Sequence, residues 1–224
     1  MRLLFFIFLI SALISCEKED TFLLNYNTTN KGVIYLFKFQ KNKPIKIDSS
    51  SNNLKHSFKI KAPFSELFLI GPSIDKSVLF IAENRLKNTI VLEDSNYYDI
   101  NIKGDSTNII LQEYFKQKNK VILQLQEINN SDNFDKQKES EKIISDHIDF
   151  VHDFIRKNSK SPAILMLLGE VNNPLEFKDE LLMIKEVVET KYKNNDFLKE
   201  INKIIQAGKQ QEQLITQQKI REQQ

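Results

Sequence analysis

Residues 21–104 alternate between short apolar runs and polar turns, with the spacing that is typical of β-strands. Within residues 55–62, for example, Phe58 and Ile60 alternate with Lys59, which gives the segment one apolar and one polar face. Clusters of Asn, Ser, Gly and Pro separate the runs and mark turns. The pattern predicts antiparallel strands in a sandwich or an open barrel. The expected strands are residues 21–27, 32–39, 43–49, 55–62, 65–71, 77–82, 88–93 and 97–104.

Two of these expected strands are apolar at every position, at residues 67–70 and 78–81. A strand of this kind is buried on both faces when a second layer of structure covers its sheet. We therefore predict that another layer packs against these two strands. The alternative is a partner-binding face, which would leave a contiguous apolar patch exposed.

Beyond Gly104 the apolar residues recur every three or four positions, which predicts helices instead of strands. Asp105 and Ser106 form a good N-cap region for the first helix, whose apolar positions extend through residues 109–128. A polar break follows, and a second helix is expected at residues 134–157. This half of the chain is therefore predicted to be helical.

Prolines mark the expected starts of two further helices. Ser161 can cap a third helix with Pro162 at its first position, where the missing N–H group is not needed. Pro174 is expected to open a fourth helix in the same way, and a fifth begins near Asp196. The Gln-rich residues 208–224 are either a helical extension or a disordered tail, and we favour a projecting helix.

The predicted fold class is α+β. An N-terminal antiparallel β-sandwich-like domain at residues 21–104 precedes a C-terminal α-helical bundle at residues 105–207. Composition agrees with a folded body, since 41% of the residues are hydrophobic and 28% are charged. With 32 basic and 30 acidic residues, the chain has no strong field to attract nucleic acid. Five glycines form no phosphate-binding loop, and one cysteine with three histidines disfavours a structural zinc site.

The N-terminus has the pattern of a secretory signal peptide, which we assign to residues 1–15. Arg2 is followed by an apolar run of about thirteen residues, which is short of the ~20 that span a bilayer as a helix. Leu13-Ile14-Ser15-Cys16 resembles a bacterial lipobox. That resemblance implies cleavage before Cys16 and attachment of palmitate-type acyl chains to it. Several acyl chains together would hold the protein on a membrane. The alternatives are an ordinary signal peptide with a chance cysteine, or an uncleaved N-terminal anchor.

The acidic segment that follows Cys16 is expected to be a solvated tether, at residues 16–20. Acidic residues in this place also resemble export signals of Bacteroidota-type lipoproteins, which imply the outer face of the outer membrane. We therefore expect an outer-membrane lipoprotein of the cell envelope, on either the periplasmic or the surface-exposed side.

The order of parts resembles a known family. The stretches that carry the resemblance include "KGVIYLFKFQKNKPIKIDSS", "HSFKIKAPFSELFLIG", "IKGDSTNIILQEYFK" and "FIRKNSKSPAILMLL". They are similar to the N-terminal β-domain and helical segment of Bacteroidota-type lipoproteins that usually end in a thioredoxin domain of the TlpA/ResA kind. The resemblance covers roughly residues 21–207. No cysteine follows Cys16, so the redox chemistry of those relatives does not carry over.

Few residues suggest catalysis or metal binding. The segment "SDHIDFVHDF" contains His147 and His152, which are five positions apart and so point about 140° apart on a helix. That separation disfavours a shared metal, although Asp149 and His152 lie on one face. Carboxylates near the ends of expected strands are assigned to surface turns, as is an arginine beside one of them. These residues are Glu83, Arg85, Glu93 and Asp94.

We therefore expect a non-enzymatic, membrane-anchored lipoprotein that acts as a binding or scaffolding module, without a cofactor or metal. Its expected partners are the membrane, through Cys16, and another envelope protein. The alternative is an accessory protein of a thiol–disulfide or nutrient-uptake system, which only the family resemblance implies. A hydrolase or metal-dependent enzyme is the least favoured reading, because it would need His152 or a carboxylate pair inside a pocket.

Overall fold

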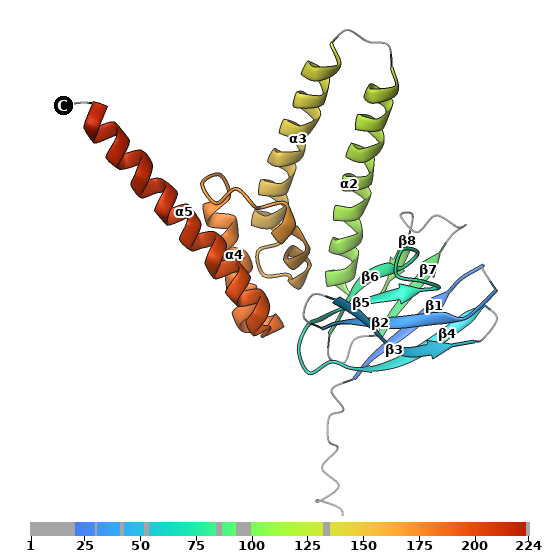
Figure 1. Ribbon diagram of the computed structural model, residues 1–224. Helices are drawn as coiled ribbons and strands as arrows, with labels where there is room; N and C mark the ends of the chain where they lie inside the picture. The colour runs from blue at the N-terminus through green and yellow to red at the C-terminus, as the bar shows by residue number, and fades with distance from the viewer. Residues whose placement is uncertain are drawn as a thin grey trace, which may run out of the picture.

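A computed structural model describes residues 21–29, 31–40, 43–51, 54–83, 87–92, 100–131 and 135–222 (Figure 1). The expected signal peptide and acidic tether lie outside these residues. Each strand expected from the alternating pattern has a counterpart in the structure. The strands are β1 (Thr21–Asn27), β2 (Ile34–Gln40), β3 (Lys43–Ser50), β4 (Lys55–Lys61), β5 (Glu66–Gly71), β6 (Val78–Ala82), β7 (Lys87–Leu92) and β8 (Ile100–Lys103).

The strands form two four-stranded sheets, with the orders β4-β1-β7-β8 and β3-β2-β5-β6. Most neighbouring strands are antiparallel, but β1 and β7 are parallel, with Tyr26 across from Ile90. The expectation of a purely antiparallel domain is therefore wrong at this pair. β4 already occupies one side of β1, and the chain then visits the other sheet through β5 and β6 before returning to the free side of β1. Whether β7 runs parallel or antiparallel to β1 depends on how the chain passes from one sheet to the other. The side-chain pattern of a single strand does not encode that connection.

The inward-facing residues of both sheets meet in one apolar cluster. Phe80 of β6 stacks on Phe22 of β1 at 5.9 Å between ring centroids, and on Phe68 of β5 at 5.7 Å. In β4, Phe58 and Ile60 are buried in this cluster and Lys59 between them is exposed, as the alternation predicts. The cluster contains Phe22, Leu24, Tyr26, Ile34, Leu36, Phe58, Ile60, Ala62, Phe68, Ile70, Val78, Phe80, Ala82, Ile90 and Ile102.

The second half of the described chain is helical. In Figure 1, α2 and α3 form an antiparallel pair that rises from the sheets, and α4 and α5 lie beside it. The elements are α2 (Ser106–Asn130), α3 (Lys136–Lys157), the 3₁₀-helix η1 (Pro162–Gly169), α4 (Lys178–Val187), the short π-helical η2 (Val188–Tyr192) and α5 (Asn195–Glu222). The Gln-rich tail expected at residues 208–224 is helical as far as it is described, because α5 continues through it to Glu222.

Two of the expected helix caps are present, and α5 begins at Asn195, next to the expected start at Asp196. Asp105 caps α2 by accepting the N–H of Asn108 at 2.8 Å, and Ser161 caps η1 by accepting the N–H of Ala163 at 3.2 Å. The expected start at Pro174 is wrong, because α4 begins four residues later at Lys178. Pro174 lies in a turn that Asn173 stabilises by accepting the N–H of Leu175 at 3.3 Å. An Asx turn followed by proline uses the same residue types as a capped helix, so the two are hard to distinguish in a sequence.

A second apolar cluster joins the helices to the sheets. It includes Leu67 of β5 and Ile81 of β6, which point away from the first cluster and pack with Leu111, Phe154 and the buried residues of η1 and α4. The prediction that another layer covers these strands is confirmed. The two clusters share β5 and β6, so the position of the helices is fixed by the outer faces of these strands.

Candidate functional site

An apolar groove of about 410 Å³ lies where the outer sheet face meets η1, η2 and α5. This volume is within the usual range of binding pockets, roughly 300–1,000 Å³. The described residues that line it are Phe39, Leu67, Leu79, Leu165, Met166, Leu168, Gly169, Tyr192, Asn194, Asp196, Phe197, Glu200 and Ile204.

The sheet wall of the groove comes from the apolar positions that the first cluster does not use. In β6, Phe80 faces the other sheet, whereas Leu79 and Ile81 face the helices. Leu67 of β5 pairs with Ile81 in the antiparallel register, so these side chains share the helix-facing side. A strand that is apolar throughout therefore supplies one wall of the core and one wall of the groove.

The helical wall depends on the local geometry of η1 and α5. A 3₁₀-helix has about three residues per turn, which places Leu165 and Leu168 one above the other on the same side. In α5, Asn194 caps the first turn by accepting the N–H groups of Asp196 and Phe197 at 3.0 and 3.1 Å. The cap directs Phe197 against Tyr192 in an edge-to-face contact with 5.4 Å between ring centroids. Burial raises the pKa of Tyr192, so its hydroxyl stays protonated.

The charged residues that line the groove are both acidic. Asp196 and Glu200 lie one turn apart on α5. The Nζ of Lys199 is 3.5 Å from Oδ1 of Asp196, in an exposed pair. Among the described residues, Glu200 has no cationic partner. The groove therefore combines apolar walls with a carboxylate that is free to pair with a cation of a ligand.

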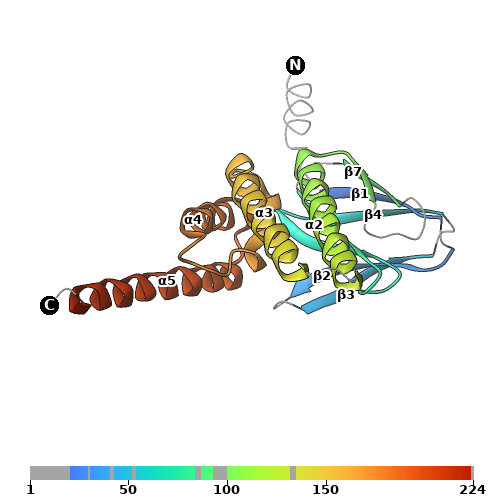
Figure 2. The same cartoon turned by 90° about the horizontal axis from the view of Figure 1, so that it is seen from above.

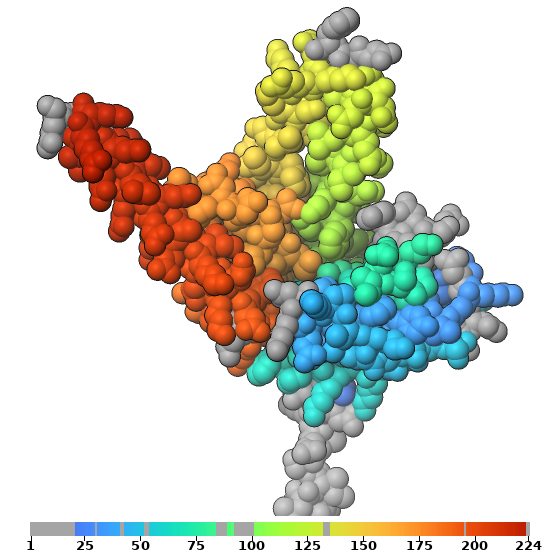
Figure 3. Space-filling view, viewed as in Figure 1, coloured from blue at the N-terminus to red at the C-terminus, as the bar shows by residue number. Residues whose placement is uncertain are grey.

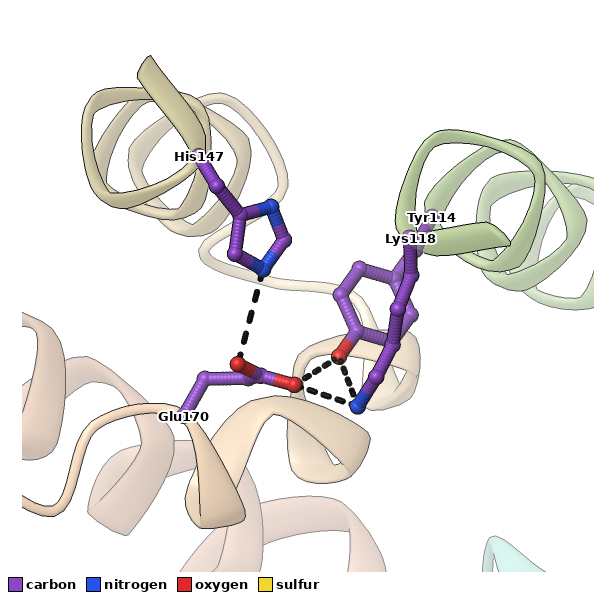
Figure 4. Close-up of polar contacts among 4 residues, drawn as sticks. All are labelled: Tyr114, Lys118, His147 and Glu170. Carbon is purple, nitrogen blue, oxygen red and sulfur yellow. Dashed lines mark hydrogen bonds and ion pairs between the residues drawn. The ribbon is translucent and has the colours of Figure 1, made fainter. Parts of the chain in front are cut away.

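A separate polar cluster joins α2, α3 and the end of η1 (Figure 4). The Oε1 of Glu170 accepts hydrogen bonds from the Tyr114 hydroxyl at 2.8 Å and from Nζ of Lys118 at 2.5 Å. On its other side, Oε2 lies 3.5 Å from Nε2 of His147. Figure 4 shows the carboxylate between these groups, which come from elements far apart in the sequence.

The protonation states in this cluster fit a structural role, in which Glu170 holds α2, α3 and the end of η1 together. Burial alone would raise the pKa of Glu170, but hydrogen bonds from Lys118 and Tyr114 and the Lys118 charge lower it overall. Burial, and then the hydrogen bond to Glu170, raise the pKa of Tyr114 well above its ordinary value. Near neutral pH the carboxylate therefore stays ionised and the phenol stays protonated. Neither group is poised to exchange a proton as a general acid or base.

The two histidines of "SDHIDFVHDF" contact different carboxylates. His147 faces Glu170, whereas Nδ1 of His152 lies 2.9 Å from Oε1 of Glu180, which also pairs with Nη2 of Arg156 at 2.8 Å. His152 stacks on Phe177 with 4.3 Å between ring centroids. The structure does not bring the histidines together. Within the described ranges, no group of three or more His, Cys, Asp or Glu side chains is placed to hold a metal ion.

Glu83 makes two hydrogen bonds at the border of an open surface depression. Its carboxylate accepts hydrogen bonds from the hydroxyls of Ser65 and Thr107, both at 3.2 Å. The depression, of about 570 Å³, is lined by Glu83 and by the exposed Lys157, Lys160 and Lys191 together with hydroxyl side chains. Arg85, Glu93 and Asp94, which the sequence also singled out, lie outside the described residues, as does Cys16. Every described helix is too short or too polar to cross a bilayer.

Sequence reasoning did not identify the groove. Its lining residues come from three strands and three helical segments, and the apolar ones among them look like ordinary core positions in the sequence. The one local signal is the pair Asp196 and Glu200 on an otherwise amphipathic helix start, which is common on solvated helices. Comparison with known proteins adds no assignment, since no family model and no curated protein matches the chain.

Proposed function

We propose that the chain is a membrane-anchored lipoprotein of the cell envelope that acts as a non-catalytic binding and scaffolding module. The lipobox at Leu13–Cys16 supports anchoring through acyl chains on Cys16. In this proposal the two sheets are a β-sandwich and the helices are a bundle that packs on its outer face. The groove between them is the binding site, and it is the observation that carries the proposal.

The lining of the groove favours binding over chemistry. Its side chains are aliphatic and aromatic, with the Tyr192 hydroxyl, the Asn194 amide and two carboxylates at the polar positions. Neither a serine or cysteine nucleophile nor a histidine base is among the described lining residues. Asp196 and Glu200 are exposed, so they lack the dry surroundings that tune a carboxylate for acid–base work.

The same lining selects a partner with apolar and basic side chains. An amphipathic helix that lays its apolar face in a hydrophobic groove is a common mode of protein recognition. Here the apolar contacts would come from Leu79, Leu165 and Phe197, and Glu200 would pair with a lysine or arginine at the border of the apolar face. We therefore propose a basic, amphipathic helix of an envelope protein as the ligand.

Photo-crosslinking in the native envelope tests this function. A benzophenone side chain in place of the half-buried Met166 lies in the groove, and one in place of the exposed Lys116 on α2 serves as the control. Irradiation should give a protein adduct at position 166 and none at position 116, and the double variant Asp196→Lys and Glu200→Lys should weaken the adduct. Absence of any protein adduct at position 166 would exclude the groove as a protein-binding site.

Membrane anchoring has its own test. Replacement Cys16→Ser should abolish labelling by radioactive palmitate and should release the protein from the membrane fraction. Continued labelling of the variant would contradict the assignment of Cys16 as the lipid-attachment residue. Protease treatment of intact cells then distinguishes the two faces of the outer membrane, because only a surface-exposed protein is degraded.

A further inference from the structure

The end of α5 extends away from the rest of the described molecule. Figures 1 and 2 show the helix leaving the body, and the space-filling view in Figure 3 shows its end clear of the other elements. Its last contacts with the body are those of Gly208 with Pro174 and of Glu212 with Lys178. From residue 213 to residue 222 every described residue is exposed, including Leu214 at 60% and Ile215 at 40%.

Leu214 and Ile215 lie on the same face of α5 that, nearer the start of the helix, lines the groove. An α-helix turns by about 100° per residue. Leu214 and Ile215 therefore lie within about 60° of Glu200 around the helix axis, as do the groove residues Phe197 and Ile204. The same face of α5 thus lines the groove near residue 200 and is exposed to solvent near residue 215.

The charges near the groove differ from those at the exposed end of α5. The charges that line the groove are Asp196 and Glu200, although Lys199 and Lys203 also belong to this part of α5. Residues 213–222 carry Lys219, Arg221 and Glu222 beside the exposed apolar residues Leu214, Ile215 and Ile220. The exposed end therefore carries more basic than acidic side chains together with exposed apolar residues, and it resembles the kind of ligand that the groove selects. It cannot reach its own groove, because the straight helix separates Glu200 from Leu214 by about 21 Å.

We infer that two copies of this chain associate through antiparallel pairing of their α5 helices, with the exposed end of each helix in the groove of the other copy. This inference rests on the proposed function, since it identifies the occupant of the same groove. With the two-fold axis near Gly208, Glu200 of one copy lies level with Thr216 of the second copy. Asp196 then lies level with Ile220 of the second copy, so the two carboxylates that line each groove lie near Lys219 and Arg221 of the other helix.

The symmetry of this arrangement closes the assembly. Each copy gives one helix end and receives one, so both grooves are filled in a dimer and no open surface remains for a third copy. Leu214 and Ile215 of one copy pack against Phe197 and Ile204 of the second. Lys219 and Arg221 pair with the carboxylates at the groove border, one of which has no described cationic partner within its own chain.

Light scattering of the full chain in detergent, with the detergent mass subtracted, tests this inference. The protein should have about twice the mass of one chain. The double variant Lys219→Glu and Arg221→Glu should be a monomer, and the variant Leu214→Gln and Ile215→Gln should be one as well. A matched control, Lys116→Glu and Lys120→Glu on the exposed face of α2, changes charge equally and should remain a dimer.

A charge exchange makes the test specific. Asp196→Lys with Glu200→Lys should also give a monomer with unchanged helical circular dichroism. An equal mixture of this variant with Lys219→Glu and Arg221→Glu should restore dimers, because one acid–base interface regains its opposite charges. A monomeric parent protein, or a dimer that survives both sets of charge reversals, would overturn the inference.

The photo-crosslink at position 166 separates this inference from the proposed function. An adduct that maps to residues 214–221 of the same chain supports both. An adduct to a different protein supports the function and overturns self-pairing. No protein adduct overturns both.

Discussion

The side-chain amide of Asn108 on α2 bonds both backbone groups of Ile81 on β6. Its Oδ1 accepts the Ile81 N–H at 2.8 Å, and its Nδ2 donates to the Ile81 carbonyl at 2.7 Å. Because β6 is the last strand of its sheet, the amide occupies the place where another strand would pair. Asp105 holds Asn108 in turn, by accepting hydrogen bonds from its backbone and side chain. This contact fastens the helices to the sheet and protects an edge that would otherwise favour aggregation.

We expect the substitution Asn108→Leu to lower the free energy of unfolding by about 2–3 kcal/mol. It leaves the N–H and carbonyl of Ile81 buried without partners, and such groups cost about 1–3 kcal/mol. Urea unfolding measures the change. The control Asn130→Leu, at the exposed last residue of α2, should change the stability by less than about 0.5 kcal/mol. Equal effects of the two substitutions would show that the contact with Ile81 does not stabilise the fold.

Gly208 allows α5 to approach the turn at Pro174. A Cβ at this position would lie 2.7 Å from Cβ of Pro174, well inside the ordinary contact distance. Alanine favours a helix by about 1 kcal/mol over glycine, but overpacking of this kind costs about 1–3 kcal/mol. We therefore expect Gly208→Ala to lower the melting temperature in spite of its better helix propensity.

A second glycine provides the control for Gly208. A Cβ at Gly169 would meet nothing within 4 Å, so Gly169→Ala should leave the melting temperature unchanged or raise it slightly. Circular dichroism during heating compares the two variants directly. An increase in melting temperature for Gly208→Ala would mean that α5 does not pack closely on Pro174.

Features that depend on a few neighbouring residues were predicted from the sequence, whereas features that depend on contacts between distant residues were not. The alternation in β4 and the cap at Asp105 each depend on a few neighbouring residues, and both are as expected. The parallel pairing of β1 with β7 depends on how the chain crosses between sheets, and no local pattern encodes it. The groove likewise brings together Leu79, Leu165 and Phe197 from distant parts of the chain. In the sequence these residues look the same as residues of a filled core, because only the tertiary structure leaves a space between them.

Glu180 makes the stability of the helices sensitive to acid. Its side chain is 1% exposed, and burial alone would raise its pKa. Hydrogen bonding from His152 and the nearby charges of His152 and Arg156 lower the pKa of Glu180 below its ordinary 4.5. A carboxyl with a depressed pKa stabilises the folded state above its unfolded pKa, and this contribution disappears as pH falls through the folded pKa. Glu180 therefore contributes fully at neutral pH and progressively less below about pH 4.5.

We expect Glu180→Gln to lower the free energy of unfolding at pH 7 by about 2 kcal/mol, since a charged hydrogen bond is worth about 1.5–3 kcal/mol. Below about pH 4.5 the difference from the parent protein should shrink, because protonation removes the same interaction. Urea unfolding at pH 7 and at pH 3.5 tests both statements. Glu186→Gln, on the exposed side of α4, is the matched control and should change neither value. A constant difference at both pH values would contradict the role of the Glu180 charge.

His56 should add a second pH dependence at milder acidity. It is 2% exposed on β4, with Nδ1 2.9 Å from the Ser50 hydroxyl, and burial lowers its pKa below the ordinary 6.5. As pH falls through about 6.5, the imidazole of His56 is protonated in the unfolded chain but stays neutral in the folded protein. The folded state is therefore less stable below pH 6.5 than above it. His56→Leu should reduce the slope of stability between pH 7 and pH 5, where one group contributes at most about 1.4 kcal/mol per pH unit. Ser50→Ala removes the hydrogen bond and keeps the titrating group, so it should retain most of the slope. Parallel curves for His56→Leu and the parent protein would assign the acid sensitivity to other groups.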